Sequence, residues 1–280
     1  MILVLVLLGL LALEELLFRL DRGFFVAEED RAGESVQHVE EGELSGMTQL
    51  LSWMRILQLL LFGVLFAVTA AYAGFRLIYT PAGQIAALLL LTQVVRILNR
   101  KVINQWAVLG ATVIVQCLLL FLLLLIGVVP GVPEVSADLP GRWALSFTSF
   151  AVLFLLTVTV PFTGTYYLRL IAREGSGSYF LLPTLIYSEY WIRRLTRVTA
   201  GVAMGVLVLL AFLVVSYGYP TVPSLIHMAT VMMLLSALLL FRNRSRLHHP
   251  MAVTLVLLTW TLRIGWLVLE ASSAGDGWIG

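Results

Sequence analysis

Long apolar runs separated by short polar segments dominate the chain. Each run is about 17 residues or longer, which is the length that an α-helix needs to cross the hydrocarbon layer of a bilayer. The pattern predicts eight spans, at residues 2–18, 56–75, 82–98, 106–129, 143–170, 198–217, 222–241 and 251–269. We therefore expect an all-α integral membrane protein in which residues 1–280 form a single transmembrane helical domain.

The first apolar run, residues 2–18, contains Glu14 and Glu15 near its end. No basic residue precedes the run and no small-x-small cleavage pattern follows it, so we expect a retained first span rather than a signal peptide. The 17-residue span 82–98 follows a turn predicted at Pro81, Ala82 and Gly83.

Two polar segments interrupt the series of spans. Residues 19–55 are predicted to be a cytoplasmic acidic loop holding a short helix, and the alternative for residues 21–43 is a docking surface for a basic partner. Residues 179–195 are aromatic and apolar but contain Pro183, Glu189 and Arg193. They are predicted to form an interfacial helix in which Glu189 and Arg193, four residues apart, form an ion pair.

The distribution of basic residues predicts the orientation. If successive loops alternate between the two sides, fifteen of the 18 Lys and Arg residues fall on one side, within residues 19–55, 96–101, 169–197 and 242–246. Only Arg76 and Arg142 fall on the other side, and Arg263 lies inside a span. The positive-inside rule then places the arginine-rich loops in the cytoplasm and both termini outside, in the cell (inner or plasma) membrane.

Composition excludes several classes of function. Charged residues make up 12% of the chain, against about 25% in a soluble domain, and a net charge of +2 gives no reason to expect a nucleic-acid partner. The single cysteine, Cys117, excludes an intrachain disulfide and a thiolate metal cluster. The sequence lacks a histidine-rich cluster, paired aspartates and a Gly-x-Ser-x-Gly motif, so we do not expect an enzyme.

Span 143–170 is the most hydroxylated apolar segment. On a helical projection, six hydroxyl side chains share a sector of about 100°; they are Thr148, Ser149, Thr159, Thr163, Tyr166 and Tyr167. Pro161 cannot donate a hydrogen bond to the carbonyl of Thr157 and so frees that group. These residues are candidates for a polar path, although Val152, Leu155 and Leu156 interrupt it. The alternative is that the hydroxyls bond between helices and the proline only kinks the span.

Charged and amide side chains inside the spans mark faces that should point into the bundle. Arg263 lies near the middle of its span, where arginine costs about 2.5–3.5 kcal/mol, and Glu270 follows on the same face. Gln93 and Arg96 lie about 60° apart and are predicted to form a cytoplasmic-side polar cluster with Asn99 and Asn104, with helix-end hydrogen bonding as the alternative. The amides of Gln58, Gln84 and Gln116 should also face inward.

A soft metal site is a weak candidate at the start of span 222–241. His227, Met228 and Met232 have the ligand types of Cu(I) or a haem axial position. A second histidine at the same depth is missing from the predicted spans, so we expect no metal and no cofactor.

Three functions remain open at this point. The first is a non-catalytic membrane-embedded subunit or scaffold of a larger complex, which contacts other membrane subunits or its own copies through residues 21–43 and 179–195. The second is a small-solute or ion transporter or channel with its path along the Pro-kinked helix 143–170. The third is a pigment- or haem-binding electron-transfer subunit.

Overall fold

The protein is a bundle of long α-helices. A computed structural model describes residues 2–31, 41–73, 77, 80–98, 106–126, 142–172, 185–217, 221–242 and 248–276. Within these ranges the chain forms eight helices, so the predicted all-α class is confirmed. They are α1 (Ile2–Arg31), α2 (Glu41–Ala73), α3 (Pro81–Leu98), α4 (Trp106–Ile126), α5 (Arg142–Ala172), α6 (Leu185–Tyr217), α7 (Thr221–Arg242) and α8 (His248–Asp276).

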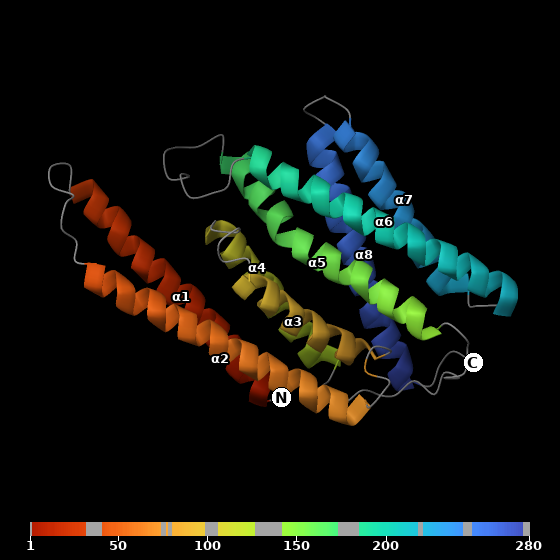
Figure 1. Cartoon of the computed structure of the whole chain (residues 1–280), viewed down its shortest axis with the longest axis horizontal. Coiled ribbons are helices and arrows are strands. Elements are labelled where there is room, and N and C mark those ends of the chain that lie inside the picture. Colours follow the sequence, from red (N-terminus) through yellow and green to blue (C-terminus); the bar gives the residue numbers. More distant parts are fainter. Residues whose placement is uncertain are drawn as a thin grey trace.

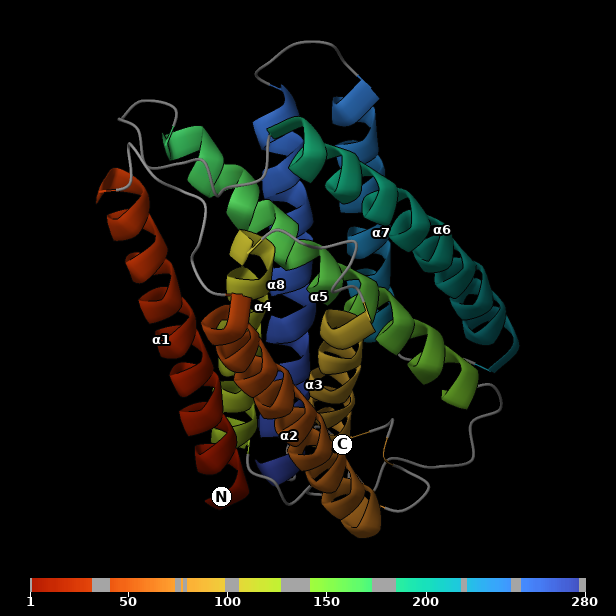
Figure 2. The same ribbon diagram turned by 60° about the vertical axis from the view of Figure 1, so that its left-hand side comes forward.

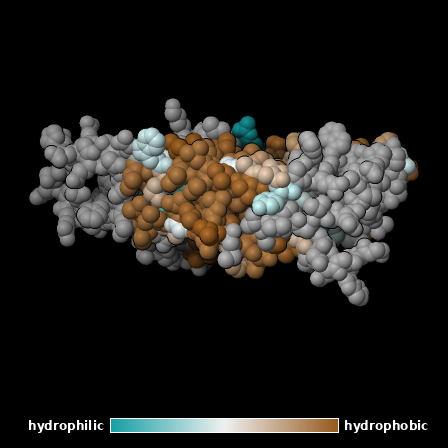
Figure 3. Space-filling model, turned by 90° about the horizontal axis from the view of Figure 1, so that it is seen from below, coloured by the Kyte–Doolittle hydropathy of each residue, from teal (hydrophilic) through white to brown (hydrophobic). Residues whose placement is uncertain are grey.

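Five helical segments in the described part of the chain are long and apolar enough to cross a membrane. A helix suits this environment because it satisfies its backbone hydrogen bonds internally. The segments are Leu50–Tyr72, Ala144–Ile171, Leu185–Ser216, Leu225–Arg242 and His248–Ala271, while Pro81–Ile97 and Ala111–Ile126 are shorter apolar helices. The face shown in Figure 3 is hydrophobic over most of its described residues, as expected for contact with lipid.

The helices form two halves, each with its own apolar core. Helices α1 and α2 lie along each other and pack with α3 and α4, whereas α5 to α8 form the other half (Figure 1). The first core is built around residues such as Leu7, Phe62 and Leu119, and the second around residues such as Val206 and Phe241. Figure 2 shows α8 in the middle of the view, and it packs against α3 and α4 as well as against α5 and α7.

Helices α5 and α8 join the halves. Both pack against α3 and α4 as well as against each other. Leu153 of α5 and Leu267 of α8 belong to the first core, and Trp260 of α8 packs against both cores. Its indole Nε1 donates a hydrogen bond to Thr157 Oγ1 of α5 at 3.1 Å.

Local chemistry explains where α3 begins. The Thr80 hydroxyl accepts a hydrogen bond from the amide of Gly83 at 3.2 Å, and Pro81 occupies the first helical position, where its missing N–H is not needed. A Cβ on Gly83 would lie 2.0 Å from the Leu77 carbonyl oxygen, so only glycine fits. The turn predicted at residues 81–83 is therefore the first turn of the helix.

The structure differs from the sequence prediction in two segments. Residues 19–31 and 41–55, predicted as part of a loop, are helical extensions of α1 and α2, while residues 32–40 lie outside the described part. Residues 185–195, predicted as a separate interfacial helix, are the first turns of α6 and continue without a break into the span; residues 179–184 are also outside the described part. None of the three helices contains a proline, so nothing interrupts their hydrogen bonding.

Candidate functional site

A buried ion-pair cluster connects α1, α2 and α3. Glu14 is 1% exposed, and its Oε1 accepts hydrogen bonds from Arg55 Nε at 2.8 Å and from Arg96 Nη2 at 2.5 Å. Its Oε2 accepts from Gln58 Nε2 at 2.8 Å. Both carboxylate oxygens are thus bonded, as a buried charge requires.

Amide side chains extend this cluster to α4. Gln58 Oε1 accepts from Gln93 Nε2 at 3.1 Å, and Gln93 Oε1 accepts from Gln116 Nε2 at 3.0 Å. All three glutamines are completely buried, as the sequence predicted, whereas Gln84 is half-buried. We call Glu14, Arg55, Gln58, Gln93, Arg96 and Gln116 the Glu14 cluster.

The Glu14 cluster has one more cation than anion among its own members, since one carboxylate faces two guanidinium groups. Two of its buried atoms, Arg96 Nε and Gln116 Oε1, form no hydrogen bond. The predicted pair Gln93 and Arg96 lies in this cluster, but Asn99 and Asn104, which were expected to join it, lie outside the described residues. Sequence reasoning missed Glu14 and Arg55 as members; the carboxylate in an apolar run was the available signal.

The second buried charge, Arg263 of α8, is 5% exposed and points into the bundle as predicted. Its Nη2 donates to the Ser149 carbonyl at 3.2 Å and also to the Ser149 hydroxyl on α5. Its Nη1 lies 3.0 Å from His227 Nδ1 on α7. A guanidinium can only donate, so Nδ1 accepts and the His227 proton is on Nε2. Glu270, the partner considered from sequence, is half-buried two turns further along α8.

The candidate metal ligands do not converge. His227 is 8% exposed and bonded to Arg263, whereas Met228 and Met232 are 51% and 61% exposed on other faces of α7. Among the described residues there is no group of three or more His, Cys, Asp or Glu side chains that could hold a metal ion. A haem or copper site at these three residues is therefore without geometric support.

Most candidate path residues on α5 bond to their own helix. Thr157 and Thr159 donate to the carbonyls of Leu153 and Leu155 at 2.8 and 2.7 Å, and Thr148 and Thr163 bond to their preceding turns in the same way. Pro161 is buried, and the helix continues through it. The donor of each of these hydroxyls is therefore used within α5.

The tyrosines of α5 connect it to α8. Tyr167 Oη donates to the Pro250 carbonyl at 3.0 Å and lies 2.5 Å from Thr254 Oγ1. Tyr166 is buried and meets the Tyr167 ring edge-on, with ring centroids 5.7 Å apart. The Tyr167 hydroxyl therefore links α5 to α8, whereas Tyr166 packs in the core of the second half.

The first turns of α6 also bond to other helices. Glu189 Oε2 lies 3.0 Å from His249 Nδ1 on α8, and Arg193 donates to the Phe241 carbonyl on α7. The predicted Glu189–Arg193 ion pair is therefore replaced by contacts between helices. The sequence could not reveal this, because it depends on which helices are neighbours.

An exposed ridge lies beside these contacts. Ile186 and Tyr190 are 82% and 54% exposed, and Arg194 follows one turn later on the same face of α6. Arg194 Nη1 donates to Tyr190 Oη at 3.2 Å, and its guanidinium lies 5.7 Å from the Trp191 ring centre. We call Ile186, Tyr190 and Arg194 the α6 ridge.

Comparisons of this chain with protein-family models, with curated proteins and with solved structures give no match.

Proposed function

We propose that the protein is a non-catalytic membrane-embedded subunit or scaffold of a larger complex. The observation that carries this proposal is the α6 ridge, an exposed aromatic and basic surface at the end of a long apolar helix. Tyr, Trp and Arg dominate the energetics of protein interfaces. Arg194 contacts both Tyr190 and Trp191, and these contacts restrict its side chain before a partner binds, which lowers the entropic cost of association.

The interior of the bundle supports the same function. The buried charges Glu14 and Arg263 bind groups on neighbouring helices, and the threonines of α5 bond to their own backbone. The buried charges therefore link neighbouring helices, and the threonine hydroxyls use their donors within α5. We infer a partner that is another membrane subunit with a carboxylate opposite Arg194.

The test is the mass and composition of the native particle. The tagged chain, extracted in a mild detergent, should co-purify with another membrane protein at a fixed stoichiometry, and native mass spectrometry should give a mass well above 31.0 kDa. Tyr190→Ser and Arg194→Glu should lose the partner. Val208→Ala is the matched control, because Val208 is 68% exposed further along the same helix. A wild-type particle containing a single chain would overturn the proposal.

The transporter alternative gives a different result in the same preparation. The single chain, reconstituted in liposomes, would move a solute, and Thr159→Val or Thr163→Val would abolish the flux. The pigment or haem alternative would give a visible absorption band in the purified protein. Either result would replace the scaffold proposal.

We also propose that the chain crosses the membrane eight times, with its arginine-rich segments in the cytoplasm. The long helices and the fifteen-to-two distribution of basic residues support this threading. In a Cys117→Ser background, Arg76→Cys and Arg244→Cys should react with an impermeant thiol reagent from opposite sides of the membrane. Labelling of both positions from the same side would contradict it.

A further inference from the structure

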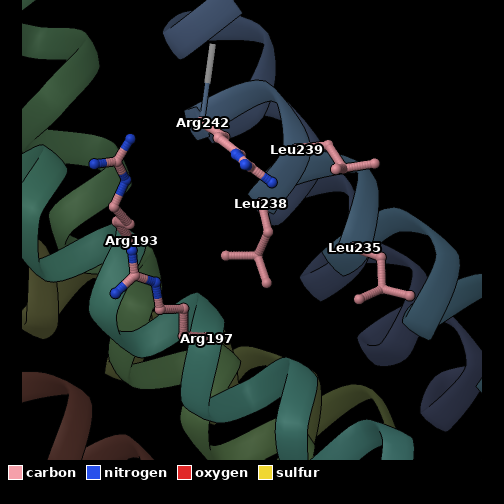
Figure 4. Close-up of a pocket in the computed structure, with 6 residues that line it drawn as sticks. All are labelled: Arg193, Arg197, Leu235, Leu238, Leu239 and Arg242. Carbon is pink, nitrogen blue, oxygen red and sulfur yellow. The ribbon is translucent and has the colours of Figure 1, made fainter. Parts of the chain in front are cut away.

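A cavity of about 530 Å³ lies between α6 and α7. Three arginines and three leucines line it, as Figure 4 shows: Arg193, Arg197, Leu235, Leu238, Leu239 and Arg242. The arginines Arg193 and Arg197 are one turn apart on α6, and Arg242 is the last residue of α7. The cavity therefore has a strongly basic end.

Within the described part of the chain, none of these three guanidinium groups forms an ion pair with a carboxylate. Arg193 is held in place by the Phe241 carbonyl, and its guanidinium lies 5.8 Å from the Phe241 ring centre. Arg197 and Arg242 are exposed. Three like charges around one cavity repel each other, so an anion bound among them would be stabilised.

The apolar wall of the cavity runs away from this basic end. Leu238 and Leu239 lie about one turn before Arg242 on α7, and Leu235 lies about two turns before it, roughly 10 Å along the helix axis. Leu235 and Leu239 are 38% and 68% exposed, so the wall is open to the surroundings of the bundle. A basic end joined to an open apolar wall matches the chemistry of an amphiphile with an anionic head.

We propose that this cavity binds an anionic phospholipid. Its phosphate accepts hydrogen bonds from Arg193, Arg197 and Arg242, and one acyl chain lies along Leu235, Leu238 and Leu239. Arginine pairs with phosphate through two parallel N–H donors, and basic cavities between membrane helices suit anionic headgroups. Free inorganic phosphate would satisfy the arginines but leave the leucine wall without a partner.

The experiment measures lipid binding to the purified full chain after delipidation, by native mass spectrometry in detergent. The probes are phosphatidylglycerol, phosphatidylcholine and inorganic phosphate. Phosphatidylglycerol should bind at least about tenfold more tightly than phosphatidylcholine, and Arg197→Gln and Arg242→Gln should each weaken it roughly fivefold. Leu239→Gln should weaken the binding of phosphatidylglycerol and leave the binding of inorganic phosphate unchanged.

The control is Arg194→Gln, which removes an equal charge one turn from Arg197 but outside the cavity lining. It should leave phosphatidylglycerol binding unchanged. An equal loss with Arg194→Gln and Arg197→Gln would overturn the proposal in favour of general surface charge. If inorganic phosphate bound as tightly as phosphatidylglycerol, and Leu239→Gln changed the binding of neither, the lipid assignment would be overturned. Binding of lipid and of inorganic phosphate is measured without a partner protein. The lipid proposal and the scaffold proposal can therefore fail independently of each other.

Discussion

The two halves of the bundle bury arginine in opposite ways. In the first half, Glu14 forms ion pairs with Arg55 and Arg96, and amide side chains of neighbouring helices add further hydrogen bonds. In the second half, Arg263 is bonded to the neutral groups of His227 and Ser149. In the first arrangement the arginines are hydrogen-bonded to a counter-charge, whereas in the second the hydrogen-bonding partners of the arginine are neutral.

This difference determines how much stability each half loses when one charged residue is removed. A buried ion pair contributes little net stability, but removing one partner leaves an uncompensated charge, which is costly. In the second half, removing Arg263 deletes the charge itself, and the hydrogen-bonding partners that it leaves behind are neutral. The Glu14 cluster should therefore be the more fragile of the two, although it contains more favourable contacts.

Glu14→Met should produce the largest loss of stability. It leaves Arg55 and Arg96 facing each other inside the bundle, and we expect a cost of about 3–5 kcal/mol. The measurement is the free energy of unfolding in mixed micelles as SDS is added. The triple variant Glu14→Met, Arg55→Met, Arg96→Met should be more stable than Glu14→Met alone. A triple variant less stable than the single one would show that the charges themselves hold the helices together.

Arg263→Met should have a smaller effect, of about 1–3 kcal/mol. It leaves the Ser149 carbonyl and His227 Nδ1 without their donor, but it also removes a buried cation. The same SDS titration gives the difference between this variant and Glu14→Met. If Arg263→Met were the more destabilising, the comparison between the two halves would be reversed.

Hydropathy was sufficient to place most helices. Span 143–170 corresponds to α5 at Arg142–Ala172, and span 222–241 to α7 at Thr221–Arg242. The predicted boundaries were wrong where polar residues follow an apolar run. Hydropathy indicates where the apolar segment ends, and the helix continues beyond that point. Residues 19–31 continue α1 because glutamate, leucine and arginine are good helix formers.

The candidate site was only partly predictable. Helical periodicity placed Gln93 and Arg96 on a common face, and the cost of a buried charge predicted that Arg263 points inward. The carboxylate that completes the first cluster comes from α1, 82 residues before Arg96 in the sequence. Partner identity depends on how helices are arranged in space, which a single sequence does not report.

Trp260→Phe tests the connection between the halves. The variant keeps an aromatic ring against both cores but removes the indole hydrogen bond to Thr157. Hydrogen bonds between membrane helices contribute about 0.6 kcal/mol on average, so we expect a loss of this size by SDS titration. Thr157→Val should cost a similar amount, and the double variant little more than either single one. Additive losses would show that the two side chains act independently.

Thr159→Val should change the free energy of unfolding least. It tests whether this hydroxyl has a structural role or lines a path. The Thr159 hydroxyl is completely buried and donates to the Leu155 carbonyl of its own helix, so its removal leaves the helix backbone bonds intact. We expect a change below about 0.5 kcal/mol in the free energy of unfolding. Tyr167→Phe is the matched comparison, because that hydroxyl bonds to α8 and should cost more. A larger loss for Thr159→Val than for Tyr167→Phe would mean that the Thr159 hydroxyl does more than bond to its own backbone.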